Sequence, residues 1–137
     1  MSRVRVVAAV IVRGGEVLAA RRGPQQRQPL LWEFPGGKVE PGETDAEALQ
    51  RELGEELAVE VSVGSRVGEV IHRYSWGTIC LVAYRCALVR GTPMALEHAE
   101  VRWVDSAGLA SLEWAPADRP LLGSVVASLP GATGGSR

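Results

Sequence analysis

The chain has 137 residues, of which 46% are hydrophobic and 23% charged, and its formal net charge is −1. These values are typical of one globular domain with a core of its own. They argue against a broad basic surface for nucleic-acid polymers, and no apolar run is long enough to span a membrane. The first residues lack the long apolar stretch of a signal peptide, so we expect a cytoplasmic protein.

The first elements are expected to be two antiparallel strands. Residues 4–12 are apolar and β-branched and end at Gly14-Gly15, a sequence that favours a tight hairpin turn. Residues 16–22 would return as the second strand. Its last residues, Arg21 and Arg22, should then point to opposite faces, so that only one of them can reach a ligand.

A loop, a short extended segment and a helix should follow. Residues 23–29 contain Gly, Pro and three Gln, which indicates an exposed loop. Residues 30–34 precede Pro35 and should be extended, and residues 36–43 are expected to form a loop. Thr44 begins a helix with a capping box, because Glu47 follows three residues later. The core-facing stripe of this helix consists of Ala46, Leu49, Leu53 and Leu57.

The same helix carries a concentrated group of carboxylates. Glu52 and Glu56 lie one turn apart, and Glu55 lies about 60° to one side of them. Like charges at this spacing repel each other, and carboxylate oxygens are suitable ligands for Mg²⁺ or Mn²⁺. The alternative is a solvated acidic face, which three glutamates alone would favour.

The surrounding sequence resembles a known family signature. Gly37 is followed after five residues by Glu43, and after seven more by Arg51-Glu52-Leu53, one residue and Glu55-Glu56. This order resembles the box of the Nudix hydrolases, and Trp32-Glu33-Phe34-Pro35 is similar to MutT-type members that hydrolyse nucleoside triphosphates. One position differs, since Ala58 stands where the family usually has glycine.

The second half of the chain is expected to be mainly strands. Residues 60–63, 67–74, 78–89 and 101–104 have strand patterns, and Ser75-Trp76-Gly77 indicates a turn. A short helical segment is predicted over residues 106–112, and a last helix from Pro116 to about Leu129. Cys80 and Cys86 lie in one predicted strand, roughly 20 Å apart, which is too far for a disulfide.

These elements predict an α/β/α sandwich with a mixed β-sheet, a loop-helix-loop Nudix box and a C-terminal helix. The resemblance implies the same fold. We expect a single domain over residues 1–130 and a disordered tail over 131–137.

The resemblance also implies how a metal site would be built. Glu52 and Glu56 would be the main ligands of Mg²⁺ or Mn²⁺ and Glu55 a supporting one, while Gly36 and Gly37 bring their backbone close to the metal or phosphate. A late loop supplies a further ligand or general base, for which Glu97 is favoured over Glu100. Arg51 is expected to orient a glutamate, Glu43 to fix the loop and His98 to be structural.

The resemblance also implies which residues contact the substrate. The MutT-type pattern places the phosphate-binding arginine at Arg22, and Lys38 is a second candidate cation. Phe34, with Val6 or Ala8, would form a flat surface for the base, although Phe34 serves equally well as plain core. Asp118 stands where MutT-type enzymes place a base-reading residue, but it also suits the N-cap of a helix.

The function implied is Mg²⁺-dependent hydrolysis of a nucleoside triphosphate to a monophosphate and pyrophosphate, as in nucleotide-pool sanitation. Candidate substrates are 8-oxo-dGTP and CTP, dCTP or 5-methyl-dCTP, and the protein would be a monomer or homodimer. Two alternatives remain: a hydrolase of ADP-ribose or a dinucleotide, and a catalytically silent nucleotide-binding module. A silent module would be expected to have lost box glutamates, and all three are present.

Overall fold

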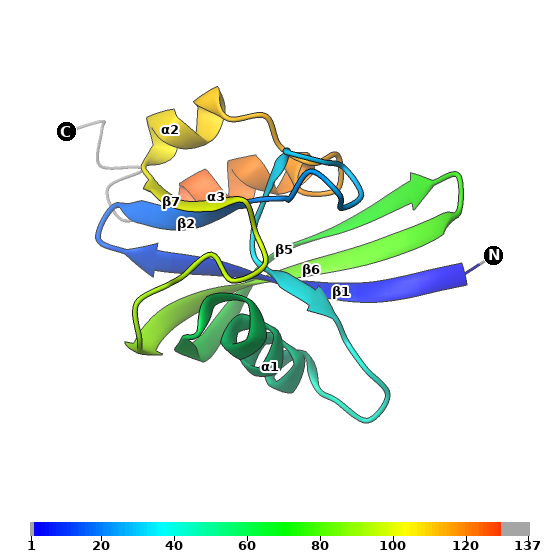
Figure 1. Cartoon of the computed structure of the whole chain (residues 1–137), viewed down its shortest axis with the longest axis horizontal. Helices are drawn as coiled ribbons and strands as arrows, with labels where there is room; N and C mark the ends of the chain where they lie inside the picture. Colours follow the sequence, from blue (N-terminus) through cyan, green and yellow to red (C-terminus); the bar gives the residue numbers. More distant parts are fainter. Residues whose placement is uncertain (1, 130–137) are drawn as a thin grey trace.

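The computed structural model describes residues 2–129, in which a mixed sheet of seven strands lies between two helical layers (Figure 1). Helix α1 (Asp45–Leu57) covers one face of the sheet. Helices α2 (Ser106–Ser111) and α3 (Leu122–Ser128) and the 3-10 turn η1 (Arg119–Leu121) cover the other. The strands are β1 (Ser2–Arg13), β2 (Glu16–Arg21), β3 (Trp32–Glu33), β4 (Gly36–Lys38), β5 (Glu60–Tyr74), β6 (Gly77–Arg90) and β7 (Glu100–Val104). The predicted α/β/α sandwich is confirmed, while the predicted tail at 131–137 lies outside the described residues.

Strand β1 joins the two parts of the sheet. It runs parallel to β6 from Ser2↔Gly77 to Ile11↔Cys86, and its middle pairs antiparallel with β4. Its last residues form the expected hairpin with β2 through Val12↔Val17 and Arg13↔Glu16. Strands β3 and β7 pair with β2, and β5 pairs with β6.

Successive β1 side chains enter different cores. Val7, Ala9 and Ile11 pack with the leucines of α1, whereas Ala8 and Val10 pack on the side of α2, η1 and α3. This follows from the two-residue period of a strand, and it explains why the whole segment is apolar rather than alternating. None of the helices in residues 2–129 is long and apolar enough to cross a membrane.

Both ends of α1 are defined by local geometry. Thr44 Oγ1 accepts from Glu47 N at 3.1 Å, and Glu47 Oε1 accepts from Thr44 N at 2.9 Å, so the predicted capping box is confirmed. Ala58 ends the helix in the left-handed region at φ 59° and ψ 39°. Alanine in this conformation costs about 1 kcal/mol that glycine would avoid.

Several expectations about local structure were wrong, and one concerns α1, whose buried alanine is Ala48 instead of Ala46. Residues 36–38 form strand β4 instead of a loop, and β5 is one strand in which shifts of register replace the expected break near Val63 and Arg66. The last helix begins after η1, so that Asp118 precedes a 3-10 turn rather than capping an α-helix. Cys80 and Cys86 are buried and free, as predicted.

Candidate active site

A cavity of about 670 Å³ opens beside the box. Its lining comes from β1, β3, β4, β5 and β6, from the loop after β2, from the last turn of α1, from the turn after β5, and from the segments before β7 and before η1. The lining residues include Arg22, Arg27, Glu33, Phe34, Gly36, Gly37, Lys38, Glu56, Tyr74, Trp76, Glu97, His98 and Asp118. Its size is in the range of small-molecule sites. Candidates that are far apart in the sequence thus share one pocket.

The glutamates of α1 differ in exposure. The side chain of Glu56 is 10% exposed and that of Glu52 is 16% exposed, whereas that of Glu55 is 55% exposed. Burial raises the pKa of Glu56 to about 10, and the nearby carboxylates of Glu52, Glu33 and Glu97 add to this rise. Glu56 is therefore a carboxyl group that stays neutral unless a cation approaches it.

Arg51 holds the outer part of this group together. Its Nη1 donates to Glu52 at 3.1 Å and to Glu55 at 3.4 Å, and its Nε donates to Glu43 at 2.7 Å. Glu43 also accepts from Glu40 N, and these bonds, led by the one from Arg51, hold the pKa of Glu43 down to about 2. Arg51 lies outside the cavity lining, and its bonds connect the helix to the preceding loop.

The donor set fits a hard divalent cation. Glu56 Oε1 is buried and makes no hydrogen bond, and it lies among carboxylates whose mutual repulsion a cation would relieve. Among the described residues, no three His, Cys, Asp or Glu side chains converge closely enough to hold a metal by themselves. Mg²⁺ does not require such a cage, because it keeps several waters and commonly takes one or two carboxylates together with substrate phosphates.

The glycines of the box allow β4 to approach its neighbours closely. At Gly36 an added Cβ would overlap the carbonyl of Val7, and at Gly37 it would lie 2.5 Å from Glu52 Oε2. Gly36 therefore requires the absence of a side chain, whereas a side chain at Gly37 would have to displace the end of Glu52. Lys38 follows on the same strand, with an exposed side chain at the cavity and a carbonyl that accepts from Arg51 Nη2 at 3.0 Å.

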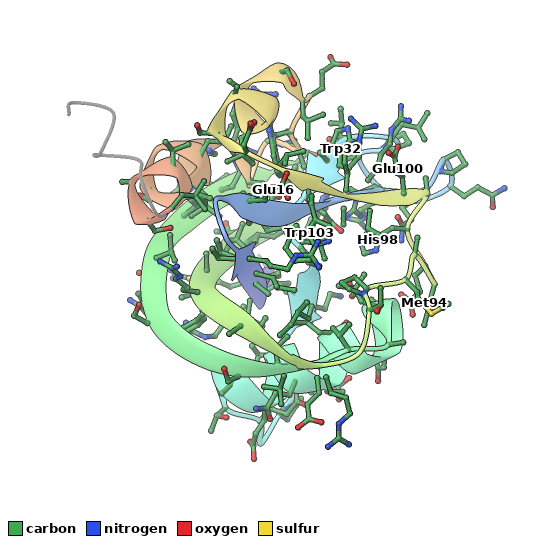
Figure 2. The ribbon with its side chains drawn as sticks, turned by 90° about the vertical axis from the view of Figure 1, so that its left-hand side faces the viewer. Glu16, Trp32, Met94, His98, Glu100 and Trp103 are labelled. Carbon is green, nitrogen blue, oxygen red and sulfur yellow. The ribbon has the colours of Figure 1, made fainter. Side chains whose placement is uncertain are left out.

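The segment before β7 separates the two late carboxylates. Glu97 is exposed and lines the cavity, whereas Glu100 binds Arg102 at 2.7 Å and does not line it. Figure 2 shows His98 between Met94, on the outer part of this segment, and Glu100, at the start of β7. Glu97 is thus the late carboxylate that the fold brings to the box.

The side chains of Arg22 and Arg21 have different surroundings, as expected. Arg22 lines the cavity, and its Nη1 donates to Glu33 Oε1 at 2.5 Å, while Arg21 Nε donates to the carbonyl of Leu30 at 3.1 Å. The other oxygen of Glu33 accepts from His98 Nε2 at 2.9 Å. Sequence reasoning missed Glu33 as a site residue, because its partners lie 11 and 65 positions away.

The far end of the cavity combines an aromatic ring with an acid. Phe34 stacks on Trp114 with ring centroids 4.6 Å apart, so it is both core and cavity wall. Asp118 makes no capping bond; its Oδ2 accepts from Phe34 N at 3.0 Å. Burial and the Glu33 carboxylate raise the pKa of Asp118 well above its ordinary value.

Comparisons with known proteins identify the family. The NUDIX domain model matches residues 1–124. A putative 8-oxo-dGTP diphosphatase 2 of Mycobacterium tuberculosis is 46% identical over 129 residues, covering 92% of this chain and 90% of that protein. The CTP pyrophosphohydrolase of Escherichia coli K12 is 42% identical over 127 residues, covering 93% and 94%.

Solved structures show the same likeness. The solution structure of the E. coli ORF135 protein superposes with a TM-score of 0.81 at 42% identity, covering 93% of this chain and 91% of that one. The crystal structure of a MutT NUDIX hydrolase from Burkholderia pseudomallei gives 0.83 at 25% identity, covering 91% and 99%. The resemblance found in the box is confirmed, and the chain belongs to the Nudix hydrolase family.

Proposed function

We propose that the protein hydrolyses a nucleoside triphosphate to a nucleoside monophosphate and pyrophosphate with Mg²⁺ as cofactor. One observation carries the proposal: a single cavity is lined by the carboxylates of Glu56 and Glu97, the cations of Arg22 and Lys38, and the ring of Phe34. The carboxylates suit a metal ion, the two cations suit the phosphates, and the aromatic ring suits a base. The names of the two relatives, an 8-oxo-dGTP diphosphatase and a CTP pyrophosphohydrolase, support this class of substrate.

The carboxylates of Glu52 and Glu56, supported by Glu55, Glu97 and the backbone at Gly36 and Gly37, would hold the metal. A bound Mg²⁺ neutralises phosphate oxygens and makes a bound water more acidic. Glu97 is the candidate general base, because it is exposed to the cavity and the described residues give its carboxylate no hydrogen-bonding partner.

The remaining residues would bind and select the substrate. Arg22 and Lys38 offer positive charge to the phosphates. Phe34 offers a flat apolar face to the base, and Asp118 offers a carboxyl group to its edge. Since Asp118 Oδ2 already accepts from Phe34 N, Oδ1 is left to form a hydrogen bond with the base.

Two substrate groups fit these features, oxidised purines such as 8-oxo-dGTP and the cytidine triphosphates CTP, dCTP and 5-methyl-dCTP. Either would give the protein a role in sanitising the cytoplasmic nucleotide pool, with no requirement for a nucleic-acid polymer.

The test is a panel of nucleoside triphosphates assayed for pyrophosphate release with Mg²⁺ and with EDTA. We expect Mg²⁺-dependent release of pyrophosphate, with one of the two groups preferred by at least tenfold in kcat/KM. Inorganic phosphate as the first product, or equal turnover in EDTA, would contradict the proposal. Selective cleavage of ADP-ribose would move the protein to another branch of the family.

A further inference from the structure

His98 and Glu33 form a partly buried connection between the carboxyl group of Glu56 and the guanidinium of Arg22. The side chain of His98 is 3% exposed, and its Nε2 lies 2.9 Å from Glu33 Oε2 and 3.9 Å from Glu56 Oε1. Glu33 Oε1 accepts from Arg22 Nη1 at 2.5 Å. A chain of contacts therefore runs from the α1 carboxylate to the candidate phosphate-binding arginine.

The backbone on both sides of His98 is fixed to other elements. Leu96 N donates to Glu56 O at 3.2 Å, and Ala99 N donates to Arg21 O at 2.9 Å. The first bond ties the segment to the end of α1, and the second ties it to the end of β2. The position of the imidazole is thus determined by the helix that carries Glu56 and by the strand that directly precedes Arg22.

The side chain of Arg22 depends on this arrangement for its direction. Its backbone is held by Arg22 N to Leu31 O and by Leu30 N to Arg22 O. Its guanidinium is held by Glu33 and by the carbonyl of Arg27, to which Nε donates. Nη2 makes no hydrogen bond within residues 2–129, and Arg22 is one of the residues that line the cavity.

Both oxygens of Glu33 are used within the protein, which makes it unsuited to act directly on a ligand. A carboxylate can only accept, so His98 carries its proton on Nε2. His98 Nδ1 is buried without a partner in the described residues, which means that the Nε2 bond is its specific polar interaction.

We propose that His98 is a positioning residue that acts through Glu33 to aim the Arg22 guanidinium at the phosphate end of the cavity. This inference rests on the proposed function for the identity of the ligand. It assigns to His98 no contact with substrate and no proton transfer. Removing the Nε2 donor frees Glu33 to rotate, and Arg22 then loses the partner that fixes its direction.

Three variants separate this role from simple packing. The amide nitrogen of glutamine reaches the place of imidazole Nε2, whereas that of asparagine reaches only the place of Nδ1, and leucine has no donor. We expect His98→Gln to keep KM within about threefold of the parent, and His98→Asn and His98→Leu to raise KM about tenfold (1.4 kcal/mol). The kcat should change little, because the lost contact serves ground state and transition state alike.

A double-mutant cycle tests the route through Arg22. Arg22→Met should raise KM, and adding His98→Leu to it should raise KM no further. Independent, additive effects would overturn the proposal. Equal KM values for His98→Gln and His98→Leu would also overturn it. So would a lower melting temperature of the His98 variants with an unchanged KM.

A measurement without nucleotide keeps the inference separate from the proposed function. The Nη1–H group of Arg22, which donates to Glu33, should give a slowly exchanging ¹⁵N–¹H signal in the parent and in His98→Gln, and this signal should shift or broaden in His98→Asn. An unchanged signal would overturn the positioning role whatever the substrate is. If the parent cleaves no nucleoside triphosphate but the signal still shifts in His98→Asn, only the proposed function is refuted.

Discussion

Gly37 and Glu52 occupy adjoining space so closely that a methyl group on Gly37 would lie 2.5 Å from Glu52 Oε2. The close packing of β4 against the Glu52 side chain of α1 therefore depends on the lack of a side chain at Gly37.

Gly37→Ala should displace the Glu52 carboxylate while leaving the fold intact, since the obstacle is the end of a movable side chain. We expect kcat/KM for the preferred triphosphate to fall at least tenfold, and Mg²⁺ affinity measured by calorimetry to fall with it. Gly15→Ala is the matched control, because an added Cβ there meets nothing within 4 Å. Equal activity of the two variants would show that the position of Glu52 is unimportant.

Glu56→Gln should abolish most turnover and remove a pH dependence of stability. The folded protein holds the Glu56 proton up to about pH 10, whereas the ordinary pKa is 4.5. This contribution to stability is complete below about pH 4.5 and is lost as the pH rises towards 10. Since a metal must displace the same proton, stabilisation by Mg²⁺ should grow with pH.

Melting temperatures between pH 6 and 9, with Mg²⁺ and with EDTA, would measure this effect. In EDTA we expect the parent to lose stability with pH more steeply than Glu56→Gln. Glu16→Gln, at the exposed first residue of β2, should behave as the parent does. Parallel curves for all three proteins would contradict the raised pKa.

Asp118→Asn should alter base preference more than stability. Asparagine Oδ1 can still accept from Phe34 N, so the melting temperature should change little. The new amide adds fixed donors, and we expect the ratio of kcat/KM between cytidine and 8-oxo-guanosine triphosphates to shift about tenfold, or 1.4 kcal/mol. Unchanged ratios together with a large loss of stability would assign Asp118 to structure alone.

Ala58→Gly should stabilise the protein without changing catalysis. The left-handed conformation at φ 59° costs alanine about 1 kcal/mol, which glycine avoids. Part of this gain is offset because glycine gives the unfolded chain more conformational freedom. We expect the melting temperature to rise by roughly 2–4 °C and kcat/KM to stay the same. Ala58→Val, with a branched Cβ, should lower it, and an equal response to both substitutions would exclude strain at this position.

Elements defined by short-range chemistry could be predicted from the sequence. The capping box of α1 involves residues three positions apart, and the first hairpin needs only a two-residue turn. Strand β4 could not be predicted, because three residues with two glycines carry no strand pattern. Its pairing is imposed by β1, about thirty positions earlier in the chain.

In the candidate site, too, the features set by local spacing could be predicted and the long-range contacts could not. The glutamates of α1 were recognisable because helical spacing places them on neighbouring faces. The contacts of Glu33 with His98 and of Phe34 with Asp118 span 65 and 84 positions and depend on how β3 meets two later loops. From the sequence the Asp118 side chain could equally have capped a helix, but in the structure it makes no capping bond.

The alternation of β1 between two cores makes the two helical layers interdependent. Ala8 and Ala9 are neighbours in the chain but belong to different cores, and both are fully or almost fully buried. Neither layer can open at β1 without exposing the other, so the strand should unfold as one cooperative unit with both layers. The amides of Ala8 and Ala9 should then exchange with solvent at the same, global rate, and neither helical layer should persist as a partly folded state without the other.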